Sequence, residues 1–256
     1  MSSNRSKRLD GETVIFTGTP KSNEAPAFVE REGGTVYSYP LIQVRSIHEE
    51  DDEIHMKRCE QATWLIFTSQ SSVASFREKM ERLDRTASHF RGKIAAVGTK
   101  TAAALERLGF TVSFIPTIFS ADVFVKQFAP TKEEQVDVVF LRGSLARSIL
   151  RDGLPFTIKE WTIYETVANE SSIEPLIETL RQTTDPTVLF ASPSAVDVYA
   201  AHVAPHVPWE RVTVAAIGHV TERALQRKGA TVDIVPETYT MIDLVRQVAK
   251  TKGRQL

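Results

Sequence analysis

The chain is short of several features that would mark a specialised class of protein. Among its 256 residues it has one cysteine, Cys59, which cannot form an internal disulfide and favours a reducing compartment. Lys plus Arg (31) nearly balance Asp plus Glu (32), without the basic surplus typical of nucleic-acid-binding proteins. No apolar run has the length of a membrane span, and polar residues 1–12 lack the core of a signal peptide. We therefore expect a cytoplasmic protein that binds neither nucleic acid nor membrane.

The common catalytic and phosphate-binding motifs are also missing. There is no G-x-x-x-x-G-K-[ST], G-x-G-x-x-G or G-x-S-x-G, and residues 18–22 match only the tail of the first. His202 and His206 have the spacing of two metal ligands, but Pro205 disturbs a helix there and no third ligand is evident. We expect a surface helix end at this pair, a packed Cys59, no metal and no cofactor.

What the chain does contain is an internal repeat. Residues 95–101 (AAVGTKT) and 215–221 (AAIGHVT) are similar at an offset of 120 (215 − 95), which continues through Gly109/Gly229, Pro116/Pro236, Phe119/Tyr239 and Gln127/Gln247. Residues 67–73 resemble 190–196 at 123, 14–16 resemble 138–140 at 124, and 39–42 resemble 164–167 at 125. Two halves, 13–130 and 136–250, predict two similar domains with a ligand-binding cleft between them.

Short apolar runs alternate with longer amphipathic ones, which predicts parallel β-sheets covered by α-helices on both faces. The expected strands are 13–17, 35–39, 64–68, 93–97, 111–115, 136–141, 157–163, 187–191, 213–217 and 231–235. The expected helices are 25–32, 71–83, 99–108, 121–128, 194–202, 220–228 and 240–251. The acidic run 49–53 suits the start of a further helix, where we expect solvated carboxylates without partners.

Hydroxyl-rich turns connect several strands to the helices that follow them. Each turn presents unpaired backbone N–H groups and the positive end of a helix dipole at the carboxyl edge of a sheet, which is a site for anions. The alternative is that the Ser and Thr side chains only cap helices. The turn residues are Thr68, Ser69 and Gln70; Gly98, Thr99, Lys100 and Thr101; Ser192 and Ser194; and Gly218, His219 and Thr221.

In their order and spacing these motifs resemble the uroporphyrinogen-III synthase family over essentially the whole chain. The resemblance is carried by 67–73, 96–101, Leu141-Arg142-Gly143 with Arg147, 163–166, 190–196 and 216–221. It implies an α/β fold of two flavodoxin-like domains joined by a two-stranded β-ladder, with an interdomain cleft. The domains would be 1–40 plus 168–256 and 45–160, and the ladder 40–44 and 161–167.

The resemblance implies cyclisation of hydroxymethylbilane to uroporphyrinogen III in haem biosynthesis, with loss of water and inversion of the last pyrrole ring. Backbone amides of the turns, with Arg142, Gly143, Arg147 and Lys100, would bind the eight substrate carboxylates. Tyr164 would assist departure of the hydroxyl; the alternative is a ladder residue that caps a neighbouring backbone group. We expect a monomer that makes transient contact with the preceding enzyme of the pathway.

One departure from the family pattern weakens the expectation of full activity. The family often has Thr-Arg-Pro after the first strand, whereas this chain has Thr17-Gly18-Thr19-Pro20. An inactive, bilobal tetrapyrrole-binding or regulatory module is therefore the alternative. A nucleotide-sugar transferase also places ligands between two α/β lobes, but it would need a Gly-rich phosphate loop, which the chain lacks.

Overall fold

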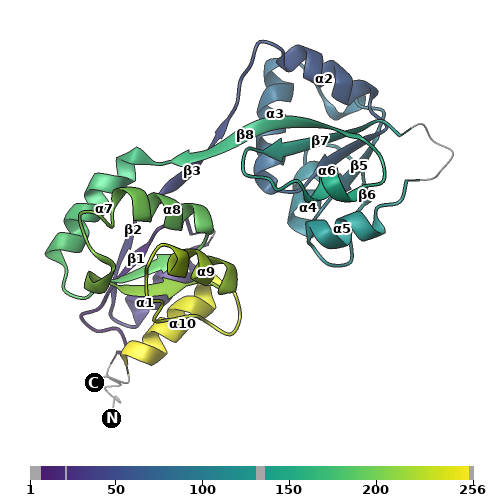
Figure 1. Ribbon diagram of the computed structural model, residues 1–256. Coiled ribbons are helices and arrows are strands. Elements are labelled where there is room, and N and C mark those ends of the chain that lie inside the picture. The colour runs from purple at the N-terminus through teal and green to yellow at the C-terminus, as the bar shows by residue number, and fades with distance from the viewer. Residues whose placement is uncertain (1–6, 21, 131–135, 254–256) are drawn as a thin grey trace. The chain divides into compact units, whose positions relative to one another are not determined.

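The computed structural model describes residues 7–20, 22–130 and 136–253, which form two compact units (Figure 1). Unit 1 takes the described residues up to Gln43 and from Val167 onward, and unit 2 takes Val44–Thr166. The chain therefore passes twice between the units, at 43–44 and at 166–167. No helix of the described part is both long enough and apolar enough to span a bilayer.

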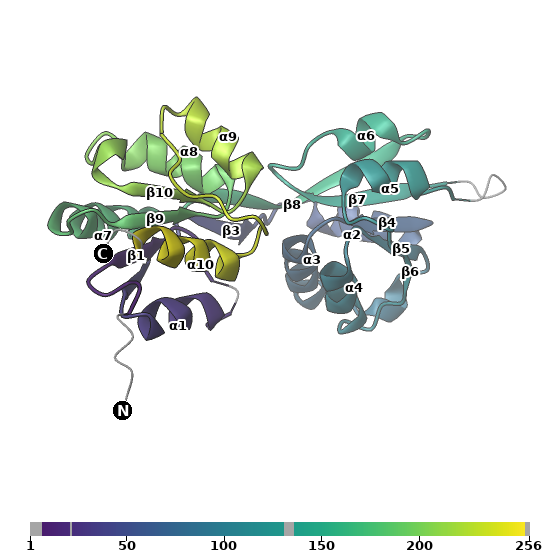
Figure 2. The ribbon, with the colours of Figure 1, turned by 90° about the horizontal axis from the view of Figure 1, so that it is seen from below.

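Unit 1 is built around a parallel sheet in the order β10-β9-β1-β2. Helices α7, α8 and α9 pack on one face, and α1 and α10 on the other (Figure 2). The strands are β1 (Thr13–Phe16), β2 (Thr35–Ser38), β9 (Thr187–Phe190) and β10 (Thr213–Ala216). The helices are α1 (Glu24–Arg31), α7 (Glu170–Gln182), α8 (Pro193–His202), the 3₁₀ turn η2 (Trp209–Arg211), α9 (His219–Arg227) and α10 (Met241–Lys252).

Unit 2 has a sheet in the order β3-β8-β7-β4-β5-β6, parallel from β8 to β6. Helices α2, α3 and α4 cover one face, and α5 and α6 the other (Figure 2). The strands are β3 (Ile42–Ser46), β4 (Trp64–Phe67), β5 (Lys93–Ala96), β6 (Val112–Phe114), β7 (Val138–Gly143) and β8 (Ile158–Ala168). The helices are α2 (Asp52–Gln61), α3 (Gln70–Arg82), the 3₁₀ turn η1 (Ala87–His89), α4 (Thr99–Glu106), α5 (Ala121–Gln127) and α6 (Ile149–Gly153).

The two sheets repeat each other strand by strand. Val14 of β1 pairs with Val36 and Thr187, and its counterpart in β7, Val138, pairs with Ile158 and with Trp64 of β4. Each sheet therefore combines strands from both halves of the sequence repeat. Unit 1 joins β1 and β2 of the first half to β9 and β10 of the second, and unit 2 joins β4 and β5 of the first half to β7 and β8 of the second. The α/β fold with parallel sheets is confirmed.

The strand registers also correct one alignment. They set the offset between β2 and β8 at 122, since Val36 and Ile158 are the equivalent partners of Val14 and Val138. Tyr39 is therefore the counterpart of Trp161, and its alignment with Tyr164 at 125 was wrong. The error arose because two tyrosines were matched by residue type, whereas the pairing of β1 with β2 and of β7 with β8 places them three residues out of register.

Most expected strands and helices are present within a few residues of their predicted limits. The strand expected at 231–235 was wrong: Ile234 makes only an isolated bridge to Ala215, although it is buried. That bridge is nonetheless the counterpart, at offset 120, of the pair between Ala95 and Phe114. Helices α6 and α7 were not predicted as separate elements.

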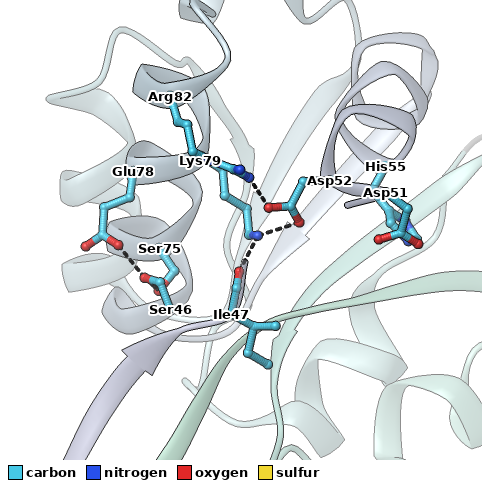
Figure 3. Close-up of polar contacts among 9 residues, drawn as sticks. All are labelled: Ser46, Ile47, Asp51, Asp52, His55, Ser75, Glu78, Lys79 and Arg82. Carbon is cyan, nitrogen blue, oxygen red and sulfur yellow. Dashed lines mark hydrogen bonds and ion pairs between the residues drawn. The ribbon is translucent and has the colours of Figure 1, made fainter. Parts of the chain in front are cut away.

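The acidic run before α2 is only partly solvated. Asp52 is 2% exposed, and its carboxylate binds Lys79 Nζ at 2.6 Å and the Arg82 guanidinium (Figure 3). Lys79, fully buried, also donates a hydrogen bond to the Ile47 carbonyl. The expectation of carboxylates without partners was therefore wrong: Asp51 and Glu53 are exposed but pair with His55 and Lys57 one turn on, each at 3.2 Å. The cations of Asp52 lie on another helix, where local patterning gives no sign of them.

Candidate functional site

The carboxyl ends of neighbouring parallel strands bring the predicted site residues of unit 2 to one edge of its sheet. Strands β8, β7, β4 and β5 are consecutive in that sheet. Tyr164 lies within β8 and pairs with Gly143, the last residue of β7, while Ser69 and Gly98 follow the ends of β4 and β5. The edge therefore combines a phenol, a close-packed glycine and the first turns of two helices, as is usual for ligand sites in parallel sheets.

Tyr164 is held at this edge by two contacts. Its hydroxyl lies 3.1 Å from Ser69 Oγ. Its ring lies against Gly143, where an added Cβ would overlap the ring and stand 2.6 Å from the phenol oxygen. The partner of the hydroxyl is thus a side chain at the start of α3, and not a neighbouring backbone group as the alternative for Tyr164 supposed. Gly143, which the sequence placed among the substrate-binding residues, makes room for the ring.

The serines of two turns act as helix caps. Ser69 Oγ accepts a hydrogen bond from the Ser72 N–H at 3.0 Å, and Ser192 Oγ accepts one from the Ala195 N–H at 3.3 Å. Ser194 Oγ lies 3.1 Å from Ser192 Oγ. The capping interpretation is confirmed for Ser69 and Ser192, and their contact with a ligand, with that of half-buried Thr68 and exposed Gln70, stays a prediction.

Helices α4 and α9 begin differently, because their N-cap residues are Gly98 and Gly218, which have no side chain to accept from the first turn. Their N-terminal N–H groups are accordingly suited to an external anion. Lys100 and His219 are exposed beside them, as is Thr99. Thr101 and Thr221 are 5% and 3% exposed, so their side chains face the core of each unit and not the solvent.

The two predicted arginines occupy different environments. Arg142 Nη1 binds Glu160 at 2.9 Å and the guanidinium donates to the Ala146 carbonyl, leaving its side chain 15% exposed. Arg147 is exposed. Glu160 was not predicted as a site residue from the sequence. Its proximity to Arg142 follows from the strand pairing, in which Glu160 of β8 pairs with Phe140, two residues before Arg142 on β7. Arg147 and Lys100 are thus the more accessible cations of this edge.

Cys59 is buried in α2, and burial raises the pKa of its thiol well above the ordinary value. The thiol therefore stays protonated at neutral pH and is a poor nucleophile, which fits the predicted packing role. Across the described residues no group of three or more His, Cys, Asp or Glu side chains is placed to hold a metal ion.

Comparisons with known proteins agree with this arrangement. The family model for uroporphyrinogen-III synthase HemD matches residues 24–246. A uroporphyrinogen-III synthase of Chlorobaculum parvum is 25% identical over 252 residues, covering 93% of this chain and 98% of the relative. A relative from Methanothermobacter thermautotrophicus is 28% identical over 253 residues, covering 92% and 96%.

Solved structures show the same fold. A mutant uroporphyrinogen III synthase from Thermus thermophilus superimposes with a TM-score of 0.62 at 17% identity, covering 96% of this chain and all of that one. The enzyme from Helicobacter pylori gives a TM-score of 0.62 at 17% identity, covering 94% and 99%.

Proposed function

The chain belongs to the uroporphyrinogen-III synthase family, and on that premise we propose that it cyclises hydroxymethylbilane to uroporphyrinogen III. The reaction breaks the bond between the terminal hydroxymethyl carbon and its oxygen, releases water, and joins the two ends of the linear tetrapyrrole with the last pyrrole ring inverted. It needs no oxidant or reductant, because the only loss is water.

The observation that carries the proposal is the placement of Tyr164. Its phenol sits at the carboxyl edge of unit 2, within hydrogen-bond distance of Ser69 Oγ and with its ring against Gly143. From there it is suited to donate a proton to the departing hydroxyl, which leaves as water and gives a protonated azafulvene and a phenolate. The final loss of a proton, when the macrocycle regains its aromatic pyrroles, allows the phenol to be restored.

The other residues of the edges would bind and orient the substrate. The backbone N–H groups of the first turns of α4 and α9, which follow Gly98 and Gly218, are suited to bind its carboxylates, as are exposed Lys100 and Arg147. Since an azafulvene forms readily, the main task is to choose which carbon attacks, a matter of positioning more than of strong acids or bases. This fits a protein without a metal-ligand cluster in its described part.

The test is a direct assay of the product isomer. Fresh hydroxymethylbilane closes spontaneously to uroporphyrinogen I, so we expect the protein to divert it to the type III isomer, resolved by chromatography after oxidation. Type I alone, at the spontaneous rate, would contradict the synthase and favour the alternative, a tetrapyrrole-binding module that has lost catalysis.

We further propose a cytoplasmic monomer whose contact with the preceding pathway enzyme is transient. Its near balance of charges and single buried cysteine support this. Sedimentation of the protein alone would show one species of about 28.6 kDa, and a stable dimer would contradict the proposal.

A further inference from the structure

Two large aromatic side chains are exposed at equivalent places in the two units. Phe119 is 58% exposed and Tyr239 is 54% exposed, and they are related by the offset of 120 that relates α5 to α10. Each stands immediately before the residue that caps its helix, Ser120 in one unit and Thr240 in the other. A single exposed apolar side chain is common on protein surfaces, but an exposed aromatic ring at both copies of a repeated turn calls for a reason.

The turns that carry these rings have the same backbone. The Ser120 N–H donates to the Ile118 carbonyl at 2.8 Å, and the Thr240 N–H donates to the Thr238 carbonyl at 2.8 Å. In unit 2 the turn is held to α5 by Gln127, whose side chain accepts from the Thr117 N–H at 2.9 Å and donates to Thr117 Oγ1 at 2.7 Å. Phe119 is thus presented on a turn that is fixed to its helix.

Both rings lie beside the glycine that begins another helix. A Cβ built on Gly98 would be 3.6 Å from Phe119 Cγ, and one built on Gly218 would be 2.8 Å from Tyr239 Cγ. Gly98 and Gly218 are the N-caps of α4 and α9, and as glycines they have no side chain to cap the first turn. Each unit therefore places an aromatic ring next to an uncapped helix start.

A purely structural role does not account for the exposure. The residue before an N-cap often packs against the fourth residue of its helix, here Phe124 or Leu244. Both of those are fully buried already, while more than half of each ring remains in water. A residue that only packed against the fourth residue of its helix would need an apolar side chain, but that contact would bury the side chain and would not leave it exposed.

We propose that Phe119 and Tyr239 are substrate-contacting residues against which pyrrole rings of the tetrapyrrole pack. This inference rests on the proposed function and identifies where the substrate rings, as distinct from its carboxylates, are held. A pyrrole carries a flat π face beside its carboxylate side chains, so an aromatic ring next to free N–H groups matches both parts of one unit of substrate. By fixing ring orientation, these contacts favour the inverted closure.

The test compares Phe119→Ala and Tyr239→Ala with Ile54→Ala, a control that removes a side chain 62% exposed on α2. We expect each aromatic variant to raise KM for hydroxymethylbilane about tenfold and to increase the type I fraction, with Phe119→Tyr and Tyr239→Phe restoring both values. Ile54→Ala should behave as the wild type. KM and isomer ratio within twofold of the wild type in both alanine variants would overturn the inference.

A binding measurement separates this inference from the proposed function. Uroporphyrin I, a stable fluorescent octacarboxylate, is titrated into each variant without turnover. Weaker binding by about tenfold in both alanine variants supports the contact even if the wild type forms no type III isomer. Unchanged binding overturns the contact even if the wild type is an active synthase.

The glycines provide a graded version of the same test. Gly218→Ala must displace Tyr239, because the added Cβ would lie within 3.0 Å of several ring atoms, whereas the Cβ of Gly98→Ala meets Phe119 at ordinary contact distance. We expect Gly218→Ala to weaken uroporphyrin binding several times more than Gly98→Ala does. Equal effects would argue against the ring as the binding element.

Discussion

Four strands have the same order in each unit, β2-β1-β9-β10 in unit 1 and β8-β7-β4-β5 in unit 2, but the side chains at their carboxyl edges differ. By the offset of 124 that relates β1 to β7, Arg142 of unit 2 is the counterpart of Gly18 in unit 1. Tyr164 of unit 2 has no tyrosine counterpart, because Tyr39 of unit 1 is equivalent to Trp161. The duplicated backbone thus gives both units the same kind of edge, while the proposed catalytic side chain, Tyr164, is found in unit 2 alone of the two equivalent positions.

The ends of β3 and β8 show the same contrast. The Ile47 N–H donates to the Ile163 carbonyl at 3.0 Å, and its counterpart, the Asn169 N–H, donates to Leu41 at 2.8 Å. In unit 1 the neutral Asn169 side chain secures this end by donating to the Pro40 carbonyl at 2.8 Å. In unit 2 the buried Lys79 ammonium does so by binding the Ile47 carbonyl (Figure 3).

The largest expected effect comes from removing that ammonium. Lys79→Met leaves the Asp52 carboxylate 2% exposed and without its only fully buried partner among the described residues, since Arg82 is 43% exposed, so we expect a loss of about 3 kcal/mol in unfolding free energy. The control in unit 1 is Lys252→Met. Lys252 is 5% exposed, but its partner Asp185 is 63% exposed and can be hydrated, so the expected loss is about 1 kcal/mol.

Urea denaturation followed by tryptophan fluorescence measures both variants. Trp64 and Trp161 report on unit 2 and Trp209 on unit 1. Equal losses in the two variants would show that the buried pair of unit 2 is no more important than the half-exposed pair of unit 1.

The next effect is on activity. Tyr164→Phe removes the hydroxyl beside Ser69, and we expect turnover to fall about 10²-fold, at the low end for a general acid because the azafulvene forms readily. Tyr39→Phe is the matched control, since it removes a hydroxyl 2.7 Å from Thr179 Oγ1 in unit 1 and should leave turnover unchanged. Similar rates of type III formation in both variants would remove Tyr164 from the mechanism.

Gly143→Ala tests Tyr164 through its second contact, the packing of its ring against Gly143. The added Cβ would overlap the Tyr164 ring and force it to move, so we expect turnover to fall at least as far as in Tyr164→Phe. In the Tyr164→Phe background, Gly143→Ala should add little further loss, because the catalytic hydroxyl is already absent. A full additional loss, measured as turnover of the double variant, would mean that Gly143 acts independently of Tyr164.

A smaller contrast concerns alkaline pH. Burial raises the pKa of the Cys59 thiol in unit 2 and of the Tyr199 phenol in unit 1 above their ordinary values of 9.0 and 10.0. Both groups are neutral when protonated, so their contribution to stability is complete below the ordinary value and is lost as pH rises above it. Unit 2 should therefore be affected about one pH unit before unit 1.

The measurement is the unfolding free energy of the wild type relative to Cys59→Ala and to Tyr199→Phe. Between about pH 8 and about pH 10, the advantage over Cys59→Ala should shrink by roughly 1 kcal/mol and that over Tyr199→Phe by clearly less, because the ordinary pKa of tyrosine is higher. Differences that do not vary with pH would show that neither group changes pKa on folding.

Much of this fold was predictable because its signals are local. The strands and helices follow from apolar runs and their spacing, and the repeat motif at 95–101 and 215–221 located the starts of α4 and α9. The turn residues around Ser69 and Gly98 were likewise placed at the correct edge, since parallel strands align their carboxyl ends.

The remaining features depend on contacts between distant residues. Asp52 finds Lys79 on another helix, and Arg142 finds Glu160 on the neighbouring strand, so neither pair has a local pattern. The role of Gly143 depends on one register shift between β7 and β8, and the alignment of Tyr39 with Tyr164 failed because the registers of β2 and β8 are not visible in the sequence. A contact determined by register can be recognised only when the partner strand is known.

The smallest and most specific test restores an arginine to unit 1. Gly18→Arg gives unit 1 the residue type that Arg142 supplies in unit 2, and a Cβ at Gly18 meets only Ala191 Cβ, at 3.9 Å. We expect stability to change by less than about 0.5 kcal/mol. The new guanidinium, near the start of α8, should lower KM for hydroxymethylbilane about two- to fivefold without changing turnover, since an exposed cation contributes little binding energy. Gly18→Gln is the uncharged control. If both variants have the KM of the wild type, the glycine after β1 is no handicap, and unit 1 holds the substrate by its backbone amides and Tyr239 without an arginine there.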